Sequence, residues 1–258
     1  MQTFQKWLIV LGAFAFAYNA ANLAHEAGHA VNVLATGGEV IGITMSPLSW
    51  SYTSHARVAE PMAVAWGGFL WRTVVPLLLA LALWCLKSRL SFWAMLLGLV
   101  AVAGAGIYML VGALVPIGDP DELIQLGMAP EALIVISLAL MLPALMLVLP
   151  IGTLLGIGRG HCSLWKTLLI FCSPILVYLL AVLGYNLVSD PFGWMMWAGT
   201  VAVGITLLPV AGVVIHVSAG WVAGDESRRR AAPINWLSAA LSVLLGAGII
   251  AFELLLLS

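Results

Sequence analysis

The sequence predicts an all-α polytopic membrane protein, with about seven transmembrane helices and a short membrane-associated β element after the first helix. Of the 258 residues, 63% are hydrophobic and only 8% are charged, and the mean hydropathy is +1.10. A soluble globular domain is about half apolar and about a quarter charged, so this composition excludes that class. The net charge of -1, from 10 basic and 11 acidic residues, provides no basic surface for nucleic acid.

Segments of about 20 apolar residues, separated by polar or Pro/Gly clusters, predict the seven helices. Their ranges are 7–35, 62–86, 90–115, 131–157, 164–188, 192–221 and 233–257. The first helix is longer than a bilayer requires, so we expect it to tilt or to protrude. We interpret residues 1–258 as a single membrane domain, because no repeat or linker divides the chain.

Three connecting segments differ from the apolar helices. Residues 37–54 begin with Gly-Gly and continue with β-branched and hydroxyl residues, which predicts one or two short strands at the membrane surface or dipping into it. Residues 116–122 combine proline with three acids and precede a short helical turn that ends near Gly127. Residues 225–230 are highly charged and predict a solvated loop.

The basic residues predict the orientation of the helices. Arg57 falls on the side opposite the N-terminus, together with most of the acids. Eight others fall on the side of the N-terminus: Lys6, Lys87, Arg89, Arg159, Lys166, Arg228, Arg229 and Arg230. By the positive-inside rule we expect a cytoplasmic N-terminus and an external C-terminus in an integral multi-pass protein of a bacterial-type inner (plasma) membrane.

The first helix contains His25-Glu26-Ala27-Gly28-His29, an H-E-x-x-H motif. Imidazoles at positions i and i+4 share one helical face and can bind one Zn²⁺, while the intervening glutamate can accept a proton from a metal-bound water. Ionisable side chains inside a membrane helix are costly unless they are paired or bound to metal. The alternative is a pair of core histidines hydrogen-bonded to neighbours, with Glu26 paired to a cation.

A polar stripe surrounds this motif. Tyr18, Asn22, His25, His29 and Asn32 follow one another at intervals of 4, 3, 4 and 3 residues, which places them on one face of the helix. Asn22 and Asn32 either fix the imidazole tautomers or hold neighbouring helices together, and the pattern favours neither.

A catalytic zinc ion needs a third protein ligand. The third helix ends on the same side as the two histidines, and we therefore favour Asp119 as that ligand, with Asp121 as the alternative. A second interpretation of Asp119 is an N-cap, with Pro120 at the first helical position. The remaining histidines are poorer candidates: His55 lies on the side of the motif, His161 on the opposite side, and His216 nearer that opposite side.

Arg72 lies inside the second predicted helix, where an arginine requires a partner. It can stabilise an oxyanion, or pair with Glu26 or an aspartate. A buried ion pair or a side chain that extends to the membrane surface are the structural alternatives, so we leave Arg72 outside the predicted catalytic set.

The motifs resemble those of the site-2 protease family of intramembrane zinc metalloproteases, in its compact branch without added soluble domains. Residues 25–30 are similar to the zinc motif of that family, and residues 37–45 to its membrane-associated β element. Residues 65–69 loosely resemble its small-residue stretch, and residues 118–123 its aspartate motif. The resemblance covers about residues 18–130.

The resemblance implies a peptide-bond hydrolase in which His25, His29 and Asp119 hold Zn²⁺ and Glu26 acts as general base. Residues 1–130 then form the metalloprotease core, and residues 131–258 add further transmembrane helices. The predicted function is a zinc-dependent intramembrane endopeptidase acting on membrane-spanning substrates in the lipid bilayer.

Two alternatives come from other classes of protein. A non-catalytic membrane subunit of a larger complex can retain a metalloprotease-like scaffold, and the small extramembrane mass favours that alternative. A transporter with a midplane zinc site is a weaker alternative, because the acids lie on one side and no repeat is visible. The expected partners are a membrane-protein substrate or a partner subunit.

Overall fold

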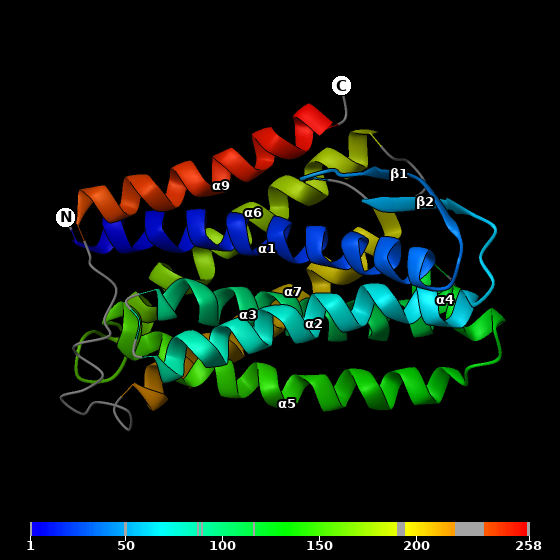
Figure 1. The fold of residues 1–258 in the computed structure, drawn as a ribbon. Coiled ribbons are helices and arrows are strands. Elements are labelled where there is room, and N and C mark those ends of the chain that lie inside the picture. The colour runs from blue at the N-terminus through cyan, green and yellow to red at the C-terminus, as the bar shows by residue number, and fades with distance from the viewer. Residues whose placement is uncertain are drawn as a thin grey trace.

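The computed structural model describes residues 2–48, 51–86, 88, 90–115, 117–189, 194–219 and 235–256. These residues form long helices and one small hairpin (Figure 1). In chain order the elements are α1 (Gln2–Ala35), β1 (Glu39–Thr44), β2 (Tyr52–Ala56), α2 (Pro61–Cys85), α3 (Ser91–Leu114), α4 (Gly118–Gln125), α5 (Pro130–Leu155), α6 (Leu164–Ser189), α7 (Trp194–Ser218) and α9 (Trp236–Leu256). The first helix begins before the predicted residue 7 and has 34 residues.

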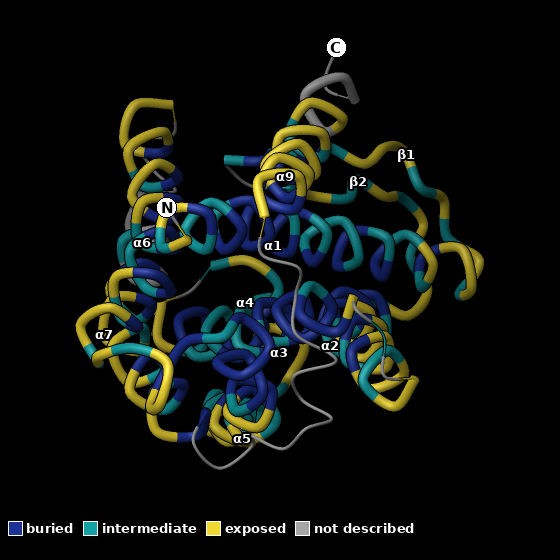
Figure 2. The backbone as a smooth tube through the Cα atoms, turned by 90° about the vertical axis from the view of Figure 1, so that its left-hand side faces the viewer, coloured by how far each residue is buried: buried dark blue, intermediate teal, exposed yellow. Residues whose placement is uncertain are grey.

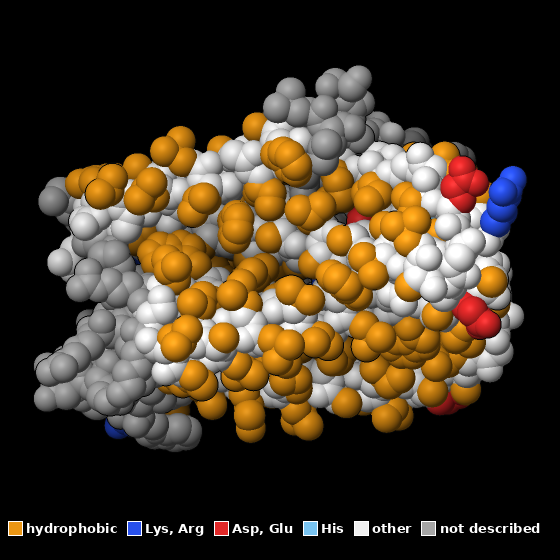
Figure 3. Space-filling view, in the orientation of Figure 1, with side chains coloured by type: hydrophobic (Ala, Val, Ile, Leu, Met, Phe, Trp, Pro, Cys, Tyr) orange, Lys and Arg blue, Asp and Glu red, His pale blue; other side chains and the backbone are white. Residues whose placement is uncertain are grey.

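Within the described residues, six helices are long and apolar enough to cross a membrane. They are α1, α2, α3, α5, α6 and the part Val201–Ser218 of α7, while Trp236–Phe252 of α9 is a shorter apolar helix. Hydrophobic side chains cover the middle of the face in Figure 3, and acidic side chains gather at the end that carries β1, β2 and α4. The protein is therefore an all-α, multi-pass membrane protein, since helices satisfy their backbone hydrogen bonds internally.

The helix α1 lies at the centre of the arrangement and contacts α2, α3, α6 and α9. The helix α9 runs along α1, and α5 packs on the other side of α3 (Figures 1 and 2). The N-terminus and the start of α9 lie at one end, whereas β1, β2 and α4 lie at the opposite end (Figure 1). In Figure 2 the buried backbone lies largely toward the interior, and exposed segments form the outer surfaces of α2, α5 and α7.

Two glycines on α1 allow neighbouring helices to approach closely. A Cβ atom added at Gly12 would overlap the backbone of Ser242 on α9, and one added at Gly28 would overlap the carbonyl oxygen of Gly67 on α2. Small residues of this kind permit backbone contact between membrane helices, where van der Waals packing drives association.

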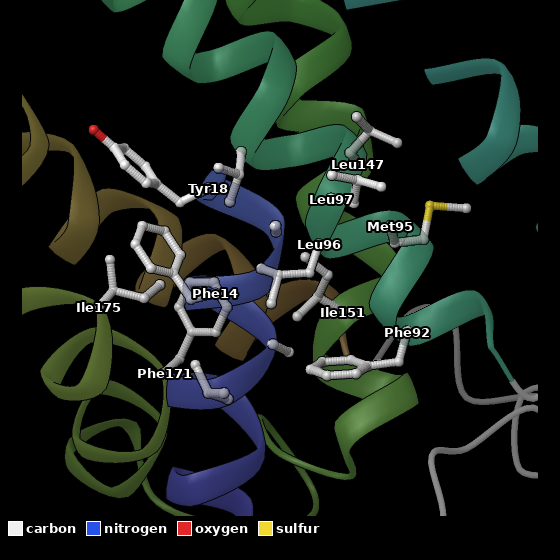
Figure 4. Close-up of a cluster of buried hydrophobic side chains, with 14 of the residues drawn as sticks. Phe14, Tyr18, Phe92, Met95, Leu96, Leu97, Leu147, Ile151, Phe171 and Ile175 are labelled. Atoms are coloured by element: carbon white, nitrogen blue, oxygen red, sulfur yellow. The ribbon is translucent and has the colours of Figure 1, made fainter. Parts of the chain in front are cut away.

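Most of the buried apolar side chains form one large cluster between α1, α3, α5 and α6 (Figure 4). Phe14 from α1, Phe92 and Leu96 from α3, Ile151 from α5 and Phe171 from α6 belong to it. Close packing of such side chains lowers the free energy of the folded state and holds the helices in register. This cluster fixes the positions from which the polar residues of α1 and α2 project.

The strands β1 and β2 form an antiparallel hairpin with Glu39 opposite Ala56 and Thr44 opposite Tyr52. The loop between them is attached to α6, because the Tyr178 hydroxyl donates to the Pro47 carbonyl (3.1 Å) and the Asn186 amide donates to the Leu48 carbonyl. These contacts, together with contacts to α1, hold the hairpin against the helices.

Several residues used for the sequence predictions lie outside the described residues. They are Trp50 and Ser49 in the predicted strand segment, Pro116, Asp190, the predicted loop at residues 225–230, and five of the basic residues that predict orientation (Lys87, Arg89, Arg228, Arg229 and Arg230). Lys6 is described, and its ammonium group donates to the Gly156 carbonyl at the end of α5 (2.5 Å).

Candidate metal centre

The structure brings together two histidines of α1 and an aspartate of α4. The Nε2 atoms of His25 and His29 lie 3.1 Å apart, and they lie 2.8 and 3.3 Å from Oδ2 of Asp119. Both histidines are buried, and Asp119 is partly buried. Residues 94 positions apart in the chain therefore place three potential ligand atoms around one point.

The hydrogen bonding of His29 determines which ring nitrogen is available. Nδ1 of His29 lies 2.8 Å from the Val64 carbonyl oxygen, which can only accept, so Nδ1 carries the proton. In a neutral imidazole, Nε2 then presents a lone pair toward Asp119 and His25. Nδ1 of His25 is buried without a hydrogen-bond partner among the described residues. Three electron-rich atoms in this arrangement require a proton or a metal cation between them.

The spacing and chemistry of the three atoms fit zinc. Zinc binds histidine nitrogen and carboxylate oxygen at about 2.0–2.2 Å, so the edges of its tetrahedron measure about 3.3–3.6 Å. The observed separation of 3.3 Å matches such an edge, whereas those of 2.8 and 3.1 Å are shorter and are hydrogen-bond distances. Two imidazoles and one carboxylate leave the fourth position open, as in catalytic rather than structural zinc sites.

Gly68 on α2 keeps the space beside the imidazoles free. A Cβ atom at this position would overlap Nε2 of His29 and would lie 2.7 Å from Cε1 of His25. Because of the Gly28–Gly67 contact, α2 lies directly against the histidine face of α1. A larger residue at position 68 would occupy the space that the ligand atoms face.

The first turn of α4 positions Asp119. The backbone at Gly118 has a positive φ of 67°, and the N–H of Asp119 donates to the hydroxyl oxygen of Tyr108 on α3 (3.2 Å). The capping interpretation of Asp119 is wrong, since α4 begins at Gly118 and its N-cap is Ile117, with no side-chain capping hydrogen bond. The carboxylate instead faces His25 and His29.

The two histidines keep the Asp119 carboxyl ionised. Burial by itself raises the pKa of Asp119, but the hydrogen bonds with His25 and His29 outweigh burial and hold the pKa well below its ordinary value. Burial, and then the charge of Asp119, raise the pKa of Glu122 in the next turn of α4. Of Asp119 and Glu122, Asp119 is therefore the acid whose anionic form the surroundings favour, as a metal ligand requires.

Glu26 is held by the hairpin. The Thr53 hydroxyl on β2 lies 2.8 Å from Oε2 of Glu26 and 3.1 Å from its backbone carbonyl. The Glu26 side chain is buried and lines the same cavity as His25, His29 and Asp119. A carboxylate oriented by one hydroxyl, next to three potential metal ligands, is suited to accept and return a proton.

The other predicted site residues have different contacts. Asn22 accepts a hydrogen bond from Arg72 (3.0 Å), and Asn32 donates to the Gly28 carbonyl (2.9 Å), where it packs against Gly67. Asp121 accepts a hydrogen bond from Gln125 (2.7 Å) and is not in the group of three ligand atoms. The observed contacts of the two asparagines are thus with a side chain and a backbone of the helices, not with an imidazole.

The remaining histidines lie apart from this group. His55 on β2 lines the cavity but is not among its metal-ligating residues. His161 lines a small pocket beside Lys6 and Gly156 at the other end of the bundle. Nδ1 of His216 lies 3.1 Å from the Thr167 hydroxyl, which connects α7 to α6.

The cavity has a volume of about 340 Å³ and extends from the three ligand atoms into the bundle. Its polar end is formed by α1, α2, α4 and β2, and its remaining walls are mostly apolar side chains from α3, α6 and α7. A volume of this size lies within the range of about 300–1,000 Å³ that is typical of ligand pockets.

Sequence reasoning missed four contributors to the site. They are Thr53, the Val64 carbonyl, Gly68 and Tyr108. No sequence signal connects Val64 or Tyr108 to the histidines, because Val64 acts through its backbone carbonyl and the Tyr108 hydroxyl contacts the backbone N–H of Asp119. Gly68 falls in the small-residue stretch at residues 65–69, which is the one feature of the chain that draws attention to it.

No protein-family model, no curated protein and no solved structure matches this chain. The proposal for its function is therefore based on the residues and geometry described above.

Proposed function

We propose that the protein is a zinc-dependent intramembrane endopeptidase. The observation that supports this function is the convergence of His25, His29 and Asp119 beside Glu26, within a bundle of membrane-spanning length. Two histidines and a carboxylate with an open fourth position are a ligand set of catalytic zinc. In such a site the metal lowers the pKa of a water molecule and polarises the carbonyl group that is attacked.

The residues of the chain then have distinct roles. His25, His29 and Asp119 hold the cation, and the Val64 carbonyl fixes the tautomer of His29. Glu26 accepts the proton of the attacking water and later returns it to the leaving amine. Thr53 keeps the Glu26 carboxylate aimed into the cavity.

The hairpin is the proposed position for the substrate. A membrane-spanning helix hides its amide bonds, so the substrate must unwind locally before hydrolysis. The edge of the β1–β2 hairpin offers unpaired backbone groups to an extended segment, and Thr53 connects that hairpin to Glu26.

We also propose how the protein is oriented in the membrane. We propose seven spans in a bacterial-type inner membrane, a cytoplasmic N-terminus, a membrane-associated hairpin and a site that opens toward the outer side. The bias of basic residues toward the N-terminal side supports this orientation.

Replacing Glu26 with Gln tests the mechanism. The purified full chain is reconstituted in liposomes with a single-span model substrate, and cleavage is followed by mass spectrometry. We expect Glu26→Gln to lower the rate by about 10²–10⁴-fold, the usual contribution of general acid–base catalysis. Zinc content and thermal stability stay unchanged, and Glu60→Gln, a matched change in an exposed glutamate, keeps full activity. Undiminished cleavage by Glu26→Gln would refute the mechanism.

The second candidate is a non-catalytic subunit that retains the metalloprotease-like scaffold. The observation that favours it is the apolar outer surface of the helices beyond residue 131, with exposed Leu138, Leu142 and Leu145 on α5. Metal analysis of the purified protein separates the two candidates. About one zinc ion per chain supports the endopeptidase, and a chain that purifies without zinc and does not bind added zinc supports the subunit.

A further inference from the structure

Arg72 of α2 is a buried cation that the proposed reaction does not use. Its side chain is only 8% exposed and lines the cavity. One guanidinium nitrogen, Nη1, donates to Oδ1 of Asn22 (3.0 Å), whereas Nε is buried and has no hydrogen-bond partner. An arginine side chain stays protonated in proteins and offers five N–H donors, so the observed contact leaves donors, Nε among them, without a hydrogen bond to the described residues.

Within the described residues, Glu26 and Asp119 act electrostatically on Arg72 from a distance, but neither forms an ion pair with it. The ion pairs found there join His25 and His29 to Asp119, and no carboxylate oxygen of the described residues lies within 4.0 Å of the guanidinium. Arginines inside membrane proteins pair with acids or mark the path of a substrate or ion. The Arg72 side chain lines the cavity and carries a buried N–H without a partner, and these two observations suggest an anionic ligand.

Helix geometry places this cation about one turn from the metal-ligating atoms. Asn22 precedes His25 by three residues on α1, and Arg72 follows Gly68 by four residues on α2, which corresponds to about 4.5 Å and about 6 Å along the respective helix axes. Gly104 on α3 leaves room for the side chain, because a Cβ atom there would lie 2.5 Å from Nη2 of Arg72. The guanidinium thus lies between the metal centre and the apolar part of the cavity.

The apolar part of the cavity lies beyond Arg72, between α1, α3, α6 and α7. We define this apolar compartment by its lining residues, which include Leu99, Val100, Ile175, Leu179 and Leu208. Its walls provide no charged side chain among the described residues. A ligand that fills it and also satisfies Arg72 must combine a hydrocarbon part with a negatively charged oxygen group.

We propose that Arg72 and Asn22 bind the carboxylate at the end of an apolar chain, with the hydrocarbon in the apolar compartment. The guanidinium fork matches a carboxylate in two hydrogen bonds, which favours it over a neutral ester or amide. Two sources carry this chemistry in a membrane: a free fatty acid, and the C-terminal carboxylate of an apolar peptide. The site needs neither the metal nor the peptidase reaction, so the two proposals can fail separately.

A binding experiment tests the carboxylate preference directly. The purified full chain in lipid nanodiscs is titrated with 11-(dansylamino)undecanoic acid and with its methyl ester, and dansyl fluorescence is measured. We expect the acid to bind at least 10-fold more tightly than the ester. Equal affinity for the acid and the ester would overturn the proposal, whether or not the protein cleaves peptides.

Matched variants assign the preference to Arg72. Arg72→Met should remove the difference between acid and ester, and Arg72→Lys should retain part of it because the positive charge remains. Gly204→Leu, which adds a side chain to the apolar compartment near Leu179, should weaken the binding of both probes. If Arg72→Met does not fold, the wild type is compared with Arg72→Lys instead. The assignment of the carboxylate preference to Arg72 is contradicted if Arg72→Lys keeps the full preference for the acid and Gly204→Leu binds both probes as the wild type does.

Competition identifies the source of the carboxylate. Myristate, acetyl-trileucine with a free C-terminus and the same peptide with an amidated C-terminus are each added to displace the dansyl acid. Displacement by myristate supports a fatty acid as ligand, and displacement by the free peptide but not the amide supports a peptide terminus. The proposal is overturned if none of the three compounds displaces the dansyl acid. It is also overturned if the free and the amidated peptides displace it equally and myristate does not displace it.

Discussion

Each half of α1 contacts a neighbouring helix through a glycine, but the side chains around the two contacts differ. In the N-terminal half, Gly12 brings the backbone of α9 close, and the surrounding side chains are apolar. In the C-terminal half, Gly28 brings α2 equally close, but the facing surfaces carry His25, His29 and Asn32. A close glycine contact therefore only sets the distance between two helices. The chemical properties of the interface depend on the side chains that face one another there.

The two halves also differ in how much change they tolerate. Around Gly12, many weak dispersion contacts are shared among apolar side chains, so the loss of a single contact lowers the stability of the folded state only slightly. Around Gly28, a few polar atoms depend on single partners: the Val64 carbonyl for His29, Thr53 for Glu26 and Asp119 for both imidazoles. We expect changes in the N-terminal half to affect stability, and changes in the C-terminal half to affect metal binding and catalysis.

The largest predicted effect distinguishes Asp119 from Asp121, two of the three acids of α4. Asp119→Asn removes the anionic ligand and should weaken zinc binding by more than the 10–100-fold that is typical of losing an outer hydrogen-bond partner. Asp121→Asn should leave zinc affinity unchanged, because Asp121 contacts Gln125 instead of the metal group. Zinc affinity is measured by competition with a chelator. Equal effects of the two substitutions would contradict the assignment of the third ligand.

The next prediction compares the same substitution at two helix contacts. Gly12→Val should separate α1 from α9 and lower the free energy of unfolding by about 1–3 kcal/mol, the usual cost of overpacking, with zinc affinity unchanged. Gly68→Val should intrude on the imidazoles of His25 and His29 and weaken zinc binding. Thermal unfolding and metal content are measured for both variants. Loss of zinc in Gly12→Val would show that the two halves are not independent.

The smallest predicted effect concerns the contact between the hairpin and the general base. Thr53→Val keeps the shape of the side chain but removes the hydroxyl that binds Glu26. A hydrogen bond to a charged group contributes about 1.5–3 kcal/mol, so the cleavage rate should fall by about 10-fold or more while zinc content is unchanged. Thr73→Val is a suitable control, since that hydroxyl bonds only the backbone of its own helix among its described contacts. Equal rates for the two variants would remove Thr53 from the site.

Much of the helical architecture could be predicted from the sequence. Apolar length sets the helix ranges, and the observed α2, α3, α5 and α6 begin and end within about two residues of the predicted segments. The position of Asp119 beside the histidines could be expected from topology, because α3 returns the chain to the end of the bundle where His25 lies. The contacts of Asn22, Asn32 and Thr53 could not, since each depends on which side chain of a neighbouring element faces it.

Three features follow from the amino-acid sequence alone: the membrane class, the helix ranges and the local pairing of His25 with His29. They depend on composition and on the 3.6-residue period of a helix. In contrast, the contact of Asp119, rather than Asp121, with the imidazoles and the pairing of Arg72 with Asn22 beside a cavity became known only from the packing of the helices. The two groups of features differ in the sequence separation of the residues that interact. Helix formation follows from neighbours in the chain, whereas the direction of a side chain between helices depends on the packing of residues that are distant in the chain.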